Sequence, residues 1–219
     1  MKSREIIEQL APYITPTRKK RIEEVLASRI HSIQIAVEHP NNPQNALAVV
    51  RTAEILGITE IHLMTDENKI EGIRGTTQGA FQWMHIHYVD TLSAFLSHCK
   101  NEITNVSPIK IAGASVAGKI HLEDVSVEQP LILLFGNEQR GLSKEAENAC
   151  DVLYKIPMFG MTESYNLSVS AAISLYDILR RKRQLLGKNS DLTQEQYETL
   201  KAEYYKKSVD QRLVLQLLT

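Results

Sequence analysis

An apolar run that ends in a glycine-containing polar loop constrains the fold of this chain more than any other feature. Residues 131–135 read Leu-Ile-Leu-Leu-Phe, and residues 136–143 read Gly-Asn-Glu-Gln-Arg-Gly-Leu-Ser. A short apolar run without polar alternation is typical of a strand buried on both faces, as in a parallel sheet. The loop after such a strand lies at the carboxyl edge of the sheet, where open α/β proteins bind ligands. This segment therefore predicts an α/β fold and one wall of a binding site.

Two further segments place polar residues at related points of the predicted fold. Residues 152–156 predict a second strand, and the polar loop after it leads into a long helix over residues 165–186. Upstream, the polar turn Asn42-Pro43-Gln44-Asn45 opens a helix over residues 45–56, whose apolar side chains recur on one face. The chain thus carries three polar segments beside predicted strand ends or helix starts.

The remaining pattern completes an alternation of strands and helices. Strands are predicted over residues 32–37, 60–64, 84–89, 109–114, 131–135 and 152–156. Thr15-Pro16 predicts a helix over 16–28, and Thr193 with Gln196 forms a capping-box pattern that opens a last helix. This alternation predicts an α/β fold with a mostly parallel sheet of about six strands, helices on both faces and helical extensions at both termini.

Composition excludes several classes of protein. The chain has 219 residues, 43% apolar content and a net charge of −1, which suits one α/β domain with terminal extensions. Cys99 and Cys150 lack metal-ligand spacing, so no metal is expected, and two isolated cysteines suit a reducing cytoplasm. The first residues lack a signal peptide's apolar stretch, and no apolar run reaches the roughly 20 residues of a membrane span. We therefore expect a cytoplasmic protein with no metal and no membrane segment.

The three polar segments, in their order along the chain, resemble the three motifs of the SpoU family of RNA ribose 2'-O-methyltransferases, within the SPOUT superfamily. They are residues 42–53, 131–143 and 156–172, and the resemblance covers residues 30–185. The flank over residues 18–38 is similar to the TrmH subgroup, the tRNA guanosine 2'-O-methyltransferases of the D-loop. The resemblance implies methyl transfer from S-adenosyl-L-methionine to the ribose 2'-hydroxyl of a tRNA nucleotide, guanosine 18 first among the candidates.

The same resemblance implies an architecture that periodicity could not reveal. It implies a C-terminal deep trefoil knot, although true knots are rare exceptions to general topology rules. It divides the chain into an N-terminal helical extension that contacts tRNA (1–30), a SPOUT methyltransferase domain (31–187) and a C-terminal helical extension (188–219). It also implies a homodimer with active sites near the subunit boundary.

Two apolar stripes are compatible with that dimer, although burial within one subunit explains them as well. The first lies on the long helix and comprises Val169, Ala172, Ile173, Tyr176 and Leu179. The second lies at the C-terminus and comprises Leu213, Val214, Leu215, Leu217 and Leu218.

Position-by-position matching to the family implies the cofactor-binding residues. They are Gly113, Gly136, Ile156 and Tyr165, with Met158 and Leu167 nearby. The family usually has leucine where this chain has Tyr165, so the wall of the adenine pocket differs. A simpler explanation for Gly113 and Gly136 is a strand-end turn without a ligand.

Arg51 is the candidate for the chemistry, because the resemblance places it at the family's catalytic arginine. An arginine has a pKa above about 12 and stays charged. We therefore expect Arg51 to bind a substrate phosphate and orient the 2'-oxygen, although the sequence leaves a role as general base open. Without the resemblance, a surface salt bridge would be the simpler interpretation. The remaining polar matches to the family's site are Asn45, Glu138, Ser164 and Asn166.

Two basic runs are candidates for RNA binding. Arg18, Lys19, Lys20 and Arg21 form the first run, and Arg180, Arg181, Lys182 and Arg183 form the second. Such runs are usually solvated helix faces, but beside these motifs they are expected to contact tRNA phosphates.

Alternatives of other classes remain at this point. One is a non-catalytic RNA-binding SPOUT protein, which the joint presence of Arg51, Glu138, Ser164 and Asn166 disfavours. Another is a ribosomal or wobble-position 2'-O-methyltransferase of the same family. About 30 residues before the first strand are too few for a separate RNA-binding domain, which favours the D-loop interpretation. A glycosidase-like pair of Glu138 and Glu163, or a nucleotide-binding glycine motif, has little support. The tRNA species is not determined by the sequence.

Overall fold

The computed structural model describes residues 2–71, 77, 79–102 and 108–218. These residues form two compact units, each with its own internal contacts. The larger, the central domain, spans residues 31–187. The smaller, the helical unit, is built from both chain ends, residues 1–30 together with 188–219.

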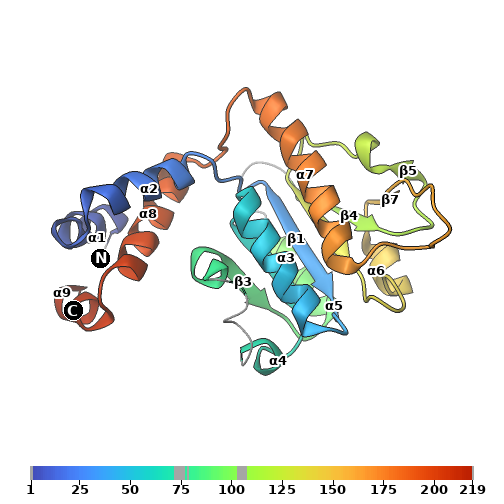
Figure 1. The fold of residues 1–219 in the computed structure, drawn as a ribbon, viewed down its shortest axis with the longest axis horizontal. Coiled ribbons are helices and arrows are strands. Elements are labelled where there is room, and N and C mark those ends of the chain that lie inside the picture. The colour runs from blue at the N-terminus through green and yellow to red at the C-terminus, as the bar shows by residue number, and fades with distance from the viewer. Residues whose placement is uncertain (1, 72–76, 78, 103–107, 219) are drawn as a thin grey trace. The chain divides into compact units, whose positions relative to one another are not determined.

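The central domain is organised around a seven-stranded sheet in the order β3-β2-β1-β6-β4-β7-β5 (Figure 1). Every strand pairing in it is parallel. The prediction of a mostly parallel α/β sheet is therefore confirmed, and the extra strand is the two-residue β5, too short to be seen in the sequence pattern. The strands are β1 (Ile33–Glu38), β2 (Glu60–Met64), β3 (His85–Tyr88), β4 (Lys110–Ala114), β5 (Ile120–His121), β6 (Leu131–Phe135) and β7 (Val152–Lys155).

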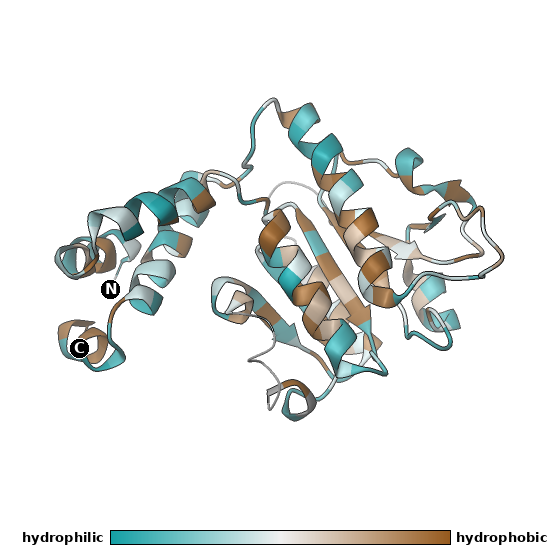
Figure 2. Ribbon diagram, in the orientation of Figure 1, coloured by the Kyte–Doolittle hydropathy of each residue, from teal (hydrophilic) through white to brown (hydrophobic). Residues whose placement is uncertain are grey.

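The middle of the sheet is its most apolar part, as the hydropathy colouring indicates (Figure 2). Every residue of β1 and of β6 is buried, which explains the unbroken apolar run at 131–135. In register, Ile33 pairs with Leu131 and Val37 with Phe135. The two strands therefore end together, and the loops that follow them start at the same edge.

Helices cover both faces of the sheet. α3 (Pro43–Leu56) and α7 (Leu167–Leu186) pack side by side on one face (Figure 1). On the other face, α5 (Leu92–Glu102) contributes Phe95 to a core cluster with Ile132 and Leu134, and α6 (Lys144–Ala149) adds Ala146. The short elements of this domain are α4 (Asn68–Glu71), η3 (Ala80–Trp83) and η4 (Leu122–Asp124).

Asparagine caps fix where α3 and α7 begin. Asn42 accepts a hydrogen bond from the Gln44 main-chain N–H (2.9 Å), and Asn166 accepts one from that of Ser168 (2.9 Å). The long helix therefore starts at Leu167 rather than at residue 165. Gly57 ends α3 with a φ of 95°, a left-handed conformation that glycine adopts without strain.

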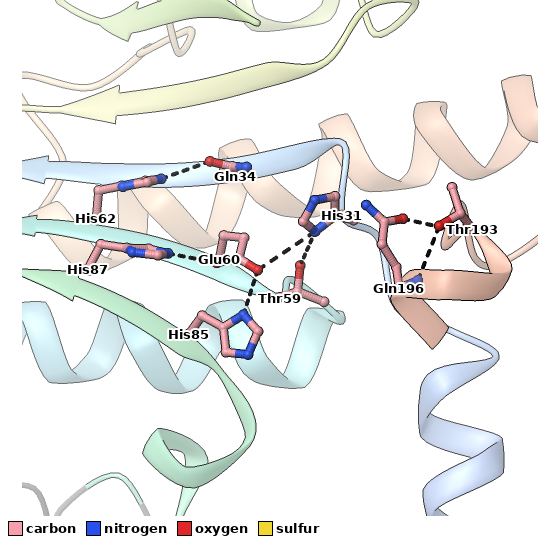
Figure 3. Close-up of polar contacts among 9 residues, drawn as sticks. All are labelled: His31, Gln34, Thr59, Glu60, His62, His85, His87, Thr193 and Gln196. Atoms are coloured by element: carbon pink, nitrogen blue, oxygen red, sulfur yellow. Dashed lines mark hydrogen bonds and ion pairs between the residues drawn. The ribbon is translucent and has the colours of Figure 1, made fainter. Parts of the chain in front are cut away.

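The helical unit consists of α1 (Ser3–Leu10), η1 (Ala11–Tyr13), α2 (Pro16–Leu26), α8 (Gln194–Ser208) and α9 (Gln211–Leu218). α8 packs on α1 and α2, and Arg4 clasps Glu198 with two hydrogen bonds of 2.8 and 2.7 Å. The predicted caps are confirmed: Thr15 caps α2, and Thr193 and Gln196 form a capping box (Figure 3). The sequence predicted one last helix, but the chain forms two, and the Asp210 carboxylate caps the second at Arg212 N–H.

A buried carboxylate and several histidines lie at the amino ends of β2 and β3 (Figure 3). Glu60 accepts hydrogen bonds from His85 Nδ1 and His87 Nε2, both at 2.8 Å. Burial alone would raise the pKa of Glu60, but these hydrogen bonds hold it at about 2. The neighbouring His62 donates from Nε2 to Gln34 Oε1 (2.8 Å), and burial lowers its pKa to about 3.

None of the helices in the described ranges combines the length and hydropathy that a bilayer crossing requires. In the same ranges, no group of three or more His, Cys, Asp or Glu side chains is arranged to hold a metal ion. The trefoil knot that the family resemblance implies stays a prediction.

Candidate active site

The loops that follow β4, β6 and β7 enclose a cavity of about 430 Å³, here called the cofactor cavity. Residues 114–117 form one wall, residues 135–142 a second, and residues 154–170 contribute a third. The cavity therefore lies at the carboxyl edge of the parallel sheet, where the sequence predicted a binding site. Its volume falls in the range of small-molecule sites.

Gly136 makes the tight turn of the loop after β6 possible. A Cβ at this position would lie 2.1 Å from the main chain of Gly141 and Leu142. The turn is closed by two main-chain hydrogen bonds between Asn137 and Gly141, of 2.9 and 2.8 Å. Any side chain at residue 136 would push this loop apart, so the glycine is needed whether or not a ligand is bound.

Glu138 joins this loop to the turn that opens α3. Its carboxylate accepts hydrogen bonds from Asn41 N–H (2.7 Å), Asn42 N–H (3.3 Å) and Asn45 Nδ2 (2.8 Å). Burial acts to raise the pKa of Glu138, but these hydrogen bonds hold the pKa below its usual value. Glu138 is therefore an ionised anchor that accepts several donors, and a poor general base.

Asn45 extends this connection to the third motif. While its Nδ2 donates to Glu138, its Oδ1 accepts from Asn166 Nδ2 (3.2 Å). Asn166 in turn accepts from the N–H and the hydroxyl of Ser168 through its Oδ1. Glu138, Asn45 and Asn166 thus form one hydrogen-bonded chain across segments 93 and 121 residues apart in sequence.

Glu38, which the sequence analysis did not single out, holds the end of the loop after β6. It ends β1, is buried, and accepts from the Ser143 hydroxyl (2.6 Å) and the Ser143 N–H (2.9 Å). The Ser143 Oγ also accepts from Ala146 N–H and so caps α6. A charged residue at the end of a buried, mostly apolar strand was the signal that could have drawn attention to it.

Most residues predicted to bind the cofactor line the cofactor cavity. They are Gly136, Ile156, Met158, Tyr165 and Leu167. Gly113 does not line it: a Cβ there would lie 2.7 to 2.8 Å from side-chain atoms of Cys150, Leu142 and Leu153. Core packing explains this glycine without a ligand. Tyr165 is partly exposed, and its hydroxyl donates to the Pro157 carbonyl (3.2 Å).

The cavity also has a wall that the sequence analysis did not assign to the site. Residues 114–117 follow β4, and Ser115 donates its hydroxyl hydrogen bond to Glu147 Oε1 (2.9 Å). Tyr154 closes the inner end, where it is fully buried and donates to Ser174 Oγ (2.9 Å). The position of β4 beside β6 explains this wall, and that pairing is not visible in local sequence.

Of the remaining predicted catalytic residues, Ser164 lines the cofactor cavity and Arg51 does not. Arg51 is exposed on α3, on the same helix as Asn45. Arg51 thus lies on the surface of the central domain. The structure brings Asn45, Glu138 and Asn166 into direct contact and leaves Arg51 and Ser164 at the accessible surface.

The two basic runs have different surroundings. In the first run, on α2, Arg18, Lys20 and Arg21 are exposed and Lys19 is partly buried. In the second run, Arg181 donates to the carbonyls of Val125 and Leu122 (2.6 and 3.0 Å). Arg181 of the second run therefore holds the segment of Leu122 and Val125 to α7.

Lys182 illustrates this structural role most clearly. It is only 4% exposed, and its ammonium donates to the carbonyl of Val127 (2.9 Å). Arg183 similarly donates to the carbonyl of Leu56 (2.8 Å), whereas Arg180 forms an ion pair with Asp177 and keeps about half of its side chain exposed. Arg180 is the member of the second run best placed to reach RNA.

Several large apolar side chains are exposed on the loop after β7 and on α7. Phe159 and Met161, in the loop after β7, are 98% and 100% exposed. On α7, Val169 and Tyr176 are also exposed, whereas Leu179 of the predicted stripe is buried. Part of that stripe therefore packs within the subunit and part faces outward.

Comparisons with known proteins identify the family. The model of the SpoU rRNA methylase family matches residues 32–176, most of the chain. This chain belongs to the SpoU methylase family. The matched range contains residues 42–53, 131–143 and 156–172, the segments that the Glu138–Asn45–Asn166 chain connects.

Individual members of the SpoU family agree with this assignment. The tRNA (guanosine(18)-2'-O)-methyltransferase of Borreliella burgdorferi is 32% identical over 200 residues, covering 91% of this chain and 89% of the relative. The A. aeolicus TrmH/SpoU tRNA modifying enzyme has a similar structure, with a TM-score of 0.73, 30% identity and coverage of 89% and 98%. The SpoU methyltransferase AviRb of Streptomyces viridochromogenes, solved with AdoMet, has a TM-score of 0.64 and 25% identity, covering 73% of this chain and 61% of that one.

Proposed function

We propose that this protein transfers a methyl group from S-adenosyl-L-methionine to the ribose 2'-hydroxyl of guanosine 18 in tRNA, in the cytoplasm. The observation that carries the proposal is the Glu138–Asn45–Asn166 chain, which connects the three segments that resemble the SpoU motifs and reaches the cofactor cavity through Glu138. Relatives that share most of this chain's length and bear that activity in their names support the choice of tRNA and nucleotide.

The cofactor cavity fits S-adenosyl-L-methionine in size and chemistry. Gly136 keeps the loop after β6 close to the cavity without a side chain, and Ile156 and Leu167 provide apolar lining. Carboxylates and cations both line the cavity, among them Glu147 and Lys155, which suits a ligand with an ammonium, a sulfonium and a carboxylate. When bound, the cofactor supplies the electrophilic methyl group.

In this proposal the residues of the site orient the ribose 2'-hydroxyl, and none of them acts as a strong general base. Glu138 accepts three hydrogen bonds and has a lowered pKa, so it serves to fix the α3 turn and Asn45. Arg51, charged and accessible on α3, binds a phosphate beside the target ribose with its planar fork. Asn45, Asn166 and Ser164 hold the surrounding polar groups in place. The 2'-oxygen is thereby held in line for attack.

The first basic run is the part of the helical unit proposed to contact tRNA. Its exposed cations on α2 can neutralise phosphates, and Arg180 can add a contact from α7. We expect a smaller contribution to tRNA binding from Arg181, Lys182 and Arg183, because their side chains already donate hydrogen bonds to main-chain carbonyls.

A homodimer is proposed from the exposed apolar side chains of the loop after β7 and of α7. Phe159, Met161 and Tyr176 are large side chains that stay exposed in a single subunit. A symmetric contact would remove them from water and would cover the loop that leads to Ser164. Met158, in the same loop, lines the cofactor cavity, so the dimer would also shape the cofactor site.

The test combines mapping with replacement of Arg51. The protein should methylate tRNA transcripts, and mass spectrometry should place the methyl group on the ribose of guanosine 18. Arg51→Ala should reduce kcat/KM at least a hundredfold while cofactor affinity stays within a few fold, and Arg51→Lys should rescue poorly because an ammonium lacks the bidentate fork. No transfer to any tRNA by the parent protein would reject the proposal, and near-parental activity of the lysine variant would reject the role of Arg51.

A further inference from the structure

A second cavity of about 430 Å³, here called the edge cavity, lies at the carboxyl ends of β1, β2 and β3. His39 and Asn41 line it after β1, Asp66 after β2, and Asp90 after β3. It is not part of the cofactor cavity, but the two share Asn137 as a common wall. The edge cavity is thus a neighbour of the methyl-transfer site.

Hydrogen bonds connect the edge cavity to the loop after β6. The main-chain N–H of Asn41 donates to Glu138 (2.7 Å), and Asn137 Nδ2 donates to the carbonyl of His39 (2.8 Å). A group that sits in the edge cavity is therefore held in a fixed relation to the chain that positions the target ribose.

His39 holds an unusual backbone conformation at this junction. Its φ of 42° makes it the one residue other than glycine with a positive φ in the described part of the chain. The conformation is maintained at both sides, because the His39 N–H donates to the Met64 carbonyl (3.1 Å) and the His39 carbonyl accepts from Asn137. Strain of this kind is kept where surrounding structure enforces it, often beside a functional site.

The charges of the edge cavity select the kind of ligand. Its described lining has no Lys or Arg, and its two carboxylates belong to Asp66 and Asp90. Asp66 Oδ1 already accepts from Asn68, whereas within the described residues no hydrogen bond engages the Asp90 carboxylate. The two carboxylates of the described lining favour a group with N–H donors over a phosphate.

We propose that the edge cavity binds the guanine base of the nucleotide that is methylated, an inference that rests on the proposed tRNA guanosine activity. Guanine carries two adjacent donors on its Watson–Crick edge, N1–H and the N2 amino group, and one carboxylate can accept from both. Adenine and uracil lack this pair. Asp90, with help from Asp66, is then the specificity-determining residue, and a ring nitrogen of His39 can donate to guanine O6.

The experiment measures guanosine selectivity in the full-length protein. The kcat/KM for methyl transfer is determined on tRNA with guanosine or inosine at the target position, since inosine lacks the 2-amino group. The parent protein should prefer guanosine by about tenfold, the worth of one charge-assisted hydrogen bond. In D90N and in the double variant D66N/D90N, kcat/KM on tRNA with guanosine should fall ten- to a hundredfold. The ratio of kcat/KM on guanosine to kcat/KM on inosine should approach one in both variants.

Controls separate this inference from folding and from the proposed function. The D90N and D66N/D90N variants should keep the parent cofactor affinity and melting temperature, because both positions are exposed and an amide oxygen at position 66 can still accept from Asn68. D124N, at an exposed aspartate away from both cavities, should match the parent in every measurement. The guanine site would be rejected, and the proposed function kept, if the active parent showed no preference for guanosine over inosine. The same conclusion would follow if the variants kept the parent's ratio of kcat/KM on guanosine and inosine. A parent that methylates no tRNA would overturn the proposed function and this inference with it.

Discussion

Glu138 shows how one side chain can connect distant segments of this protein. Its carboxylate accepts from two main-chain N–H groups of the α3 turn and from Asn45. Carboxylates that accept several N–H donors prefer the ionised form, which agrees with the lowered pKa of Glu138. The residue matters for the position of Asn45 and hence for the junction of the three motifs.

Replacing Glu138 should therefore weaken both the fold of the site and catalysis. Glu138→Gln places an amide donor where three donors already point, so kcat/KM should fall at least tenfold and stability by about 1–3 kcal/mol. Steady-state kinetics and chemical denaturation measure the two effects. Glu123→Gln, at an exposed carboxylate outside both cavities, is the matched control. Parental kinetics in the Glu138 variant would show that the anchor is dispensable.

At the scale of single elements, the amino ends of β2 and β3 carry a pH-sensitive cluster. Burial and the nearby His87 and His98 lower the pKa of His62 from 6.5 to about 3. Below pH 6.5 the unfolded chain binds a proton at His62 that the folded chain refuses, so stability falls as the pH falls from 6.5 towards 3. Glu60, with its pKa lowered from 4.5 to about 2, adds stability above pH 4.5 that is lost as the pH falls towards 2.

This cluster predicts acid sensitivity that a single replacement reduces. His62 should lower the unfolding free energy of the parent by up to about 1.4 kcal/mol for each pH unit as the pH falls from about 6 to 4. His62→Gln, which keeps a polar partner for Gln34, should flatten that slope even if it lowers stability at neutral pH. Denaturant titrations at several pH values give the comparison. His121→Gln, at an exposed histidine, should keep the parental slope, and equal slopes in the His62 variant and the parent would contradict the assignment.

The two basic runs predict different effects of replacement on α2 and on α7: loss of tRNA affinity for the first run and loss of stability for Lys182 of the second. Changing Arg18, Lys19, Lys20 and Arg21 on α2 to Gln should leave the melting temperature nearly unchanged but weaken tRNA binding. The slope of log affinity against log salt should fall by roughly 0.7–0.9 for each phosphate that is no longer neutralised. Filter binding at several salt concentrations measures it. A salt slope unaffected by these changes would mean that the first run is only a solvated face.

Lys182→Met on α7 should show the reverse behaviour. It removes a buried ammonium that donates to the Val127 carbonyl, so the unfolding free energy should fall by about 1–3 kcal/mol. The tRNA affinity of the folded protein should stay near that of the parent. Chemical denaturation and the same binding assay test both expectations, and parental stability together with weakened tRNA binding would reverse the role assigned to Lys182.

At the scale of the whole molecule, the exposed loop after β7 predicts assembly. Phe159 and Met161 are almost fully exposed, and burying such side chains is worth about 1.5–3 kcal/mol each. We expect a homodimer at low micromolar concentration, with an interface above about 2,000 Å² if it is obligate. Light scattering should give the dimer mass for the parent and a monomer mass for the double variant Phe159→Glu/Met161→Glu. A parent that stays monomeric with cofactor and tRNA present would exclude the dimer.

The sequence by itself determined most of the elements and pointed to the family. The unbroken apolar run at 131–135 predicted β6 to the residue, because strands buried on both faces have no polar alternation. The strand predicted over 60–64 also matches β2, although Glu60 and His62 interrupt its apolar residues. Thr15 and Thr193 marked helix starts, because capping depends on residues two or three positions away. The helix expected over 45–56 starts two residues earlier, at Pro43, after the Asn42 cap. The three motifs led to the SpoU family, since each is contiguous along the chain.

Only the tertiary structure decided what these segments contact. The carboxylate of Glu138 meets Asn41, 97 residues away, and Lys182 meets Val127, 55 residues away. The first contact makes Glu138 an anchor, and the second turns a member of a basic run into a buried support. The pairing of the two chain ends in one helical unit has the same origin. Such contacts depend on strand order and helix packing, which local patterns do not encode, so neighbouring residues alone could not have predicted them.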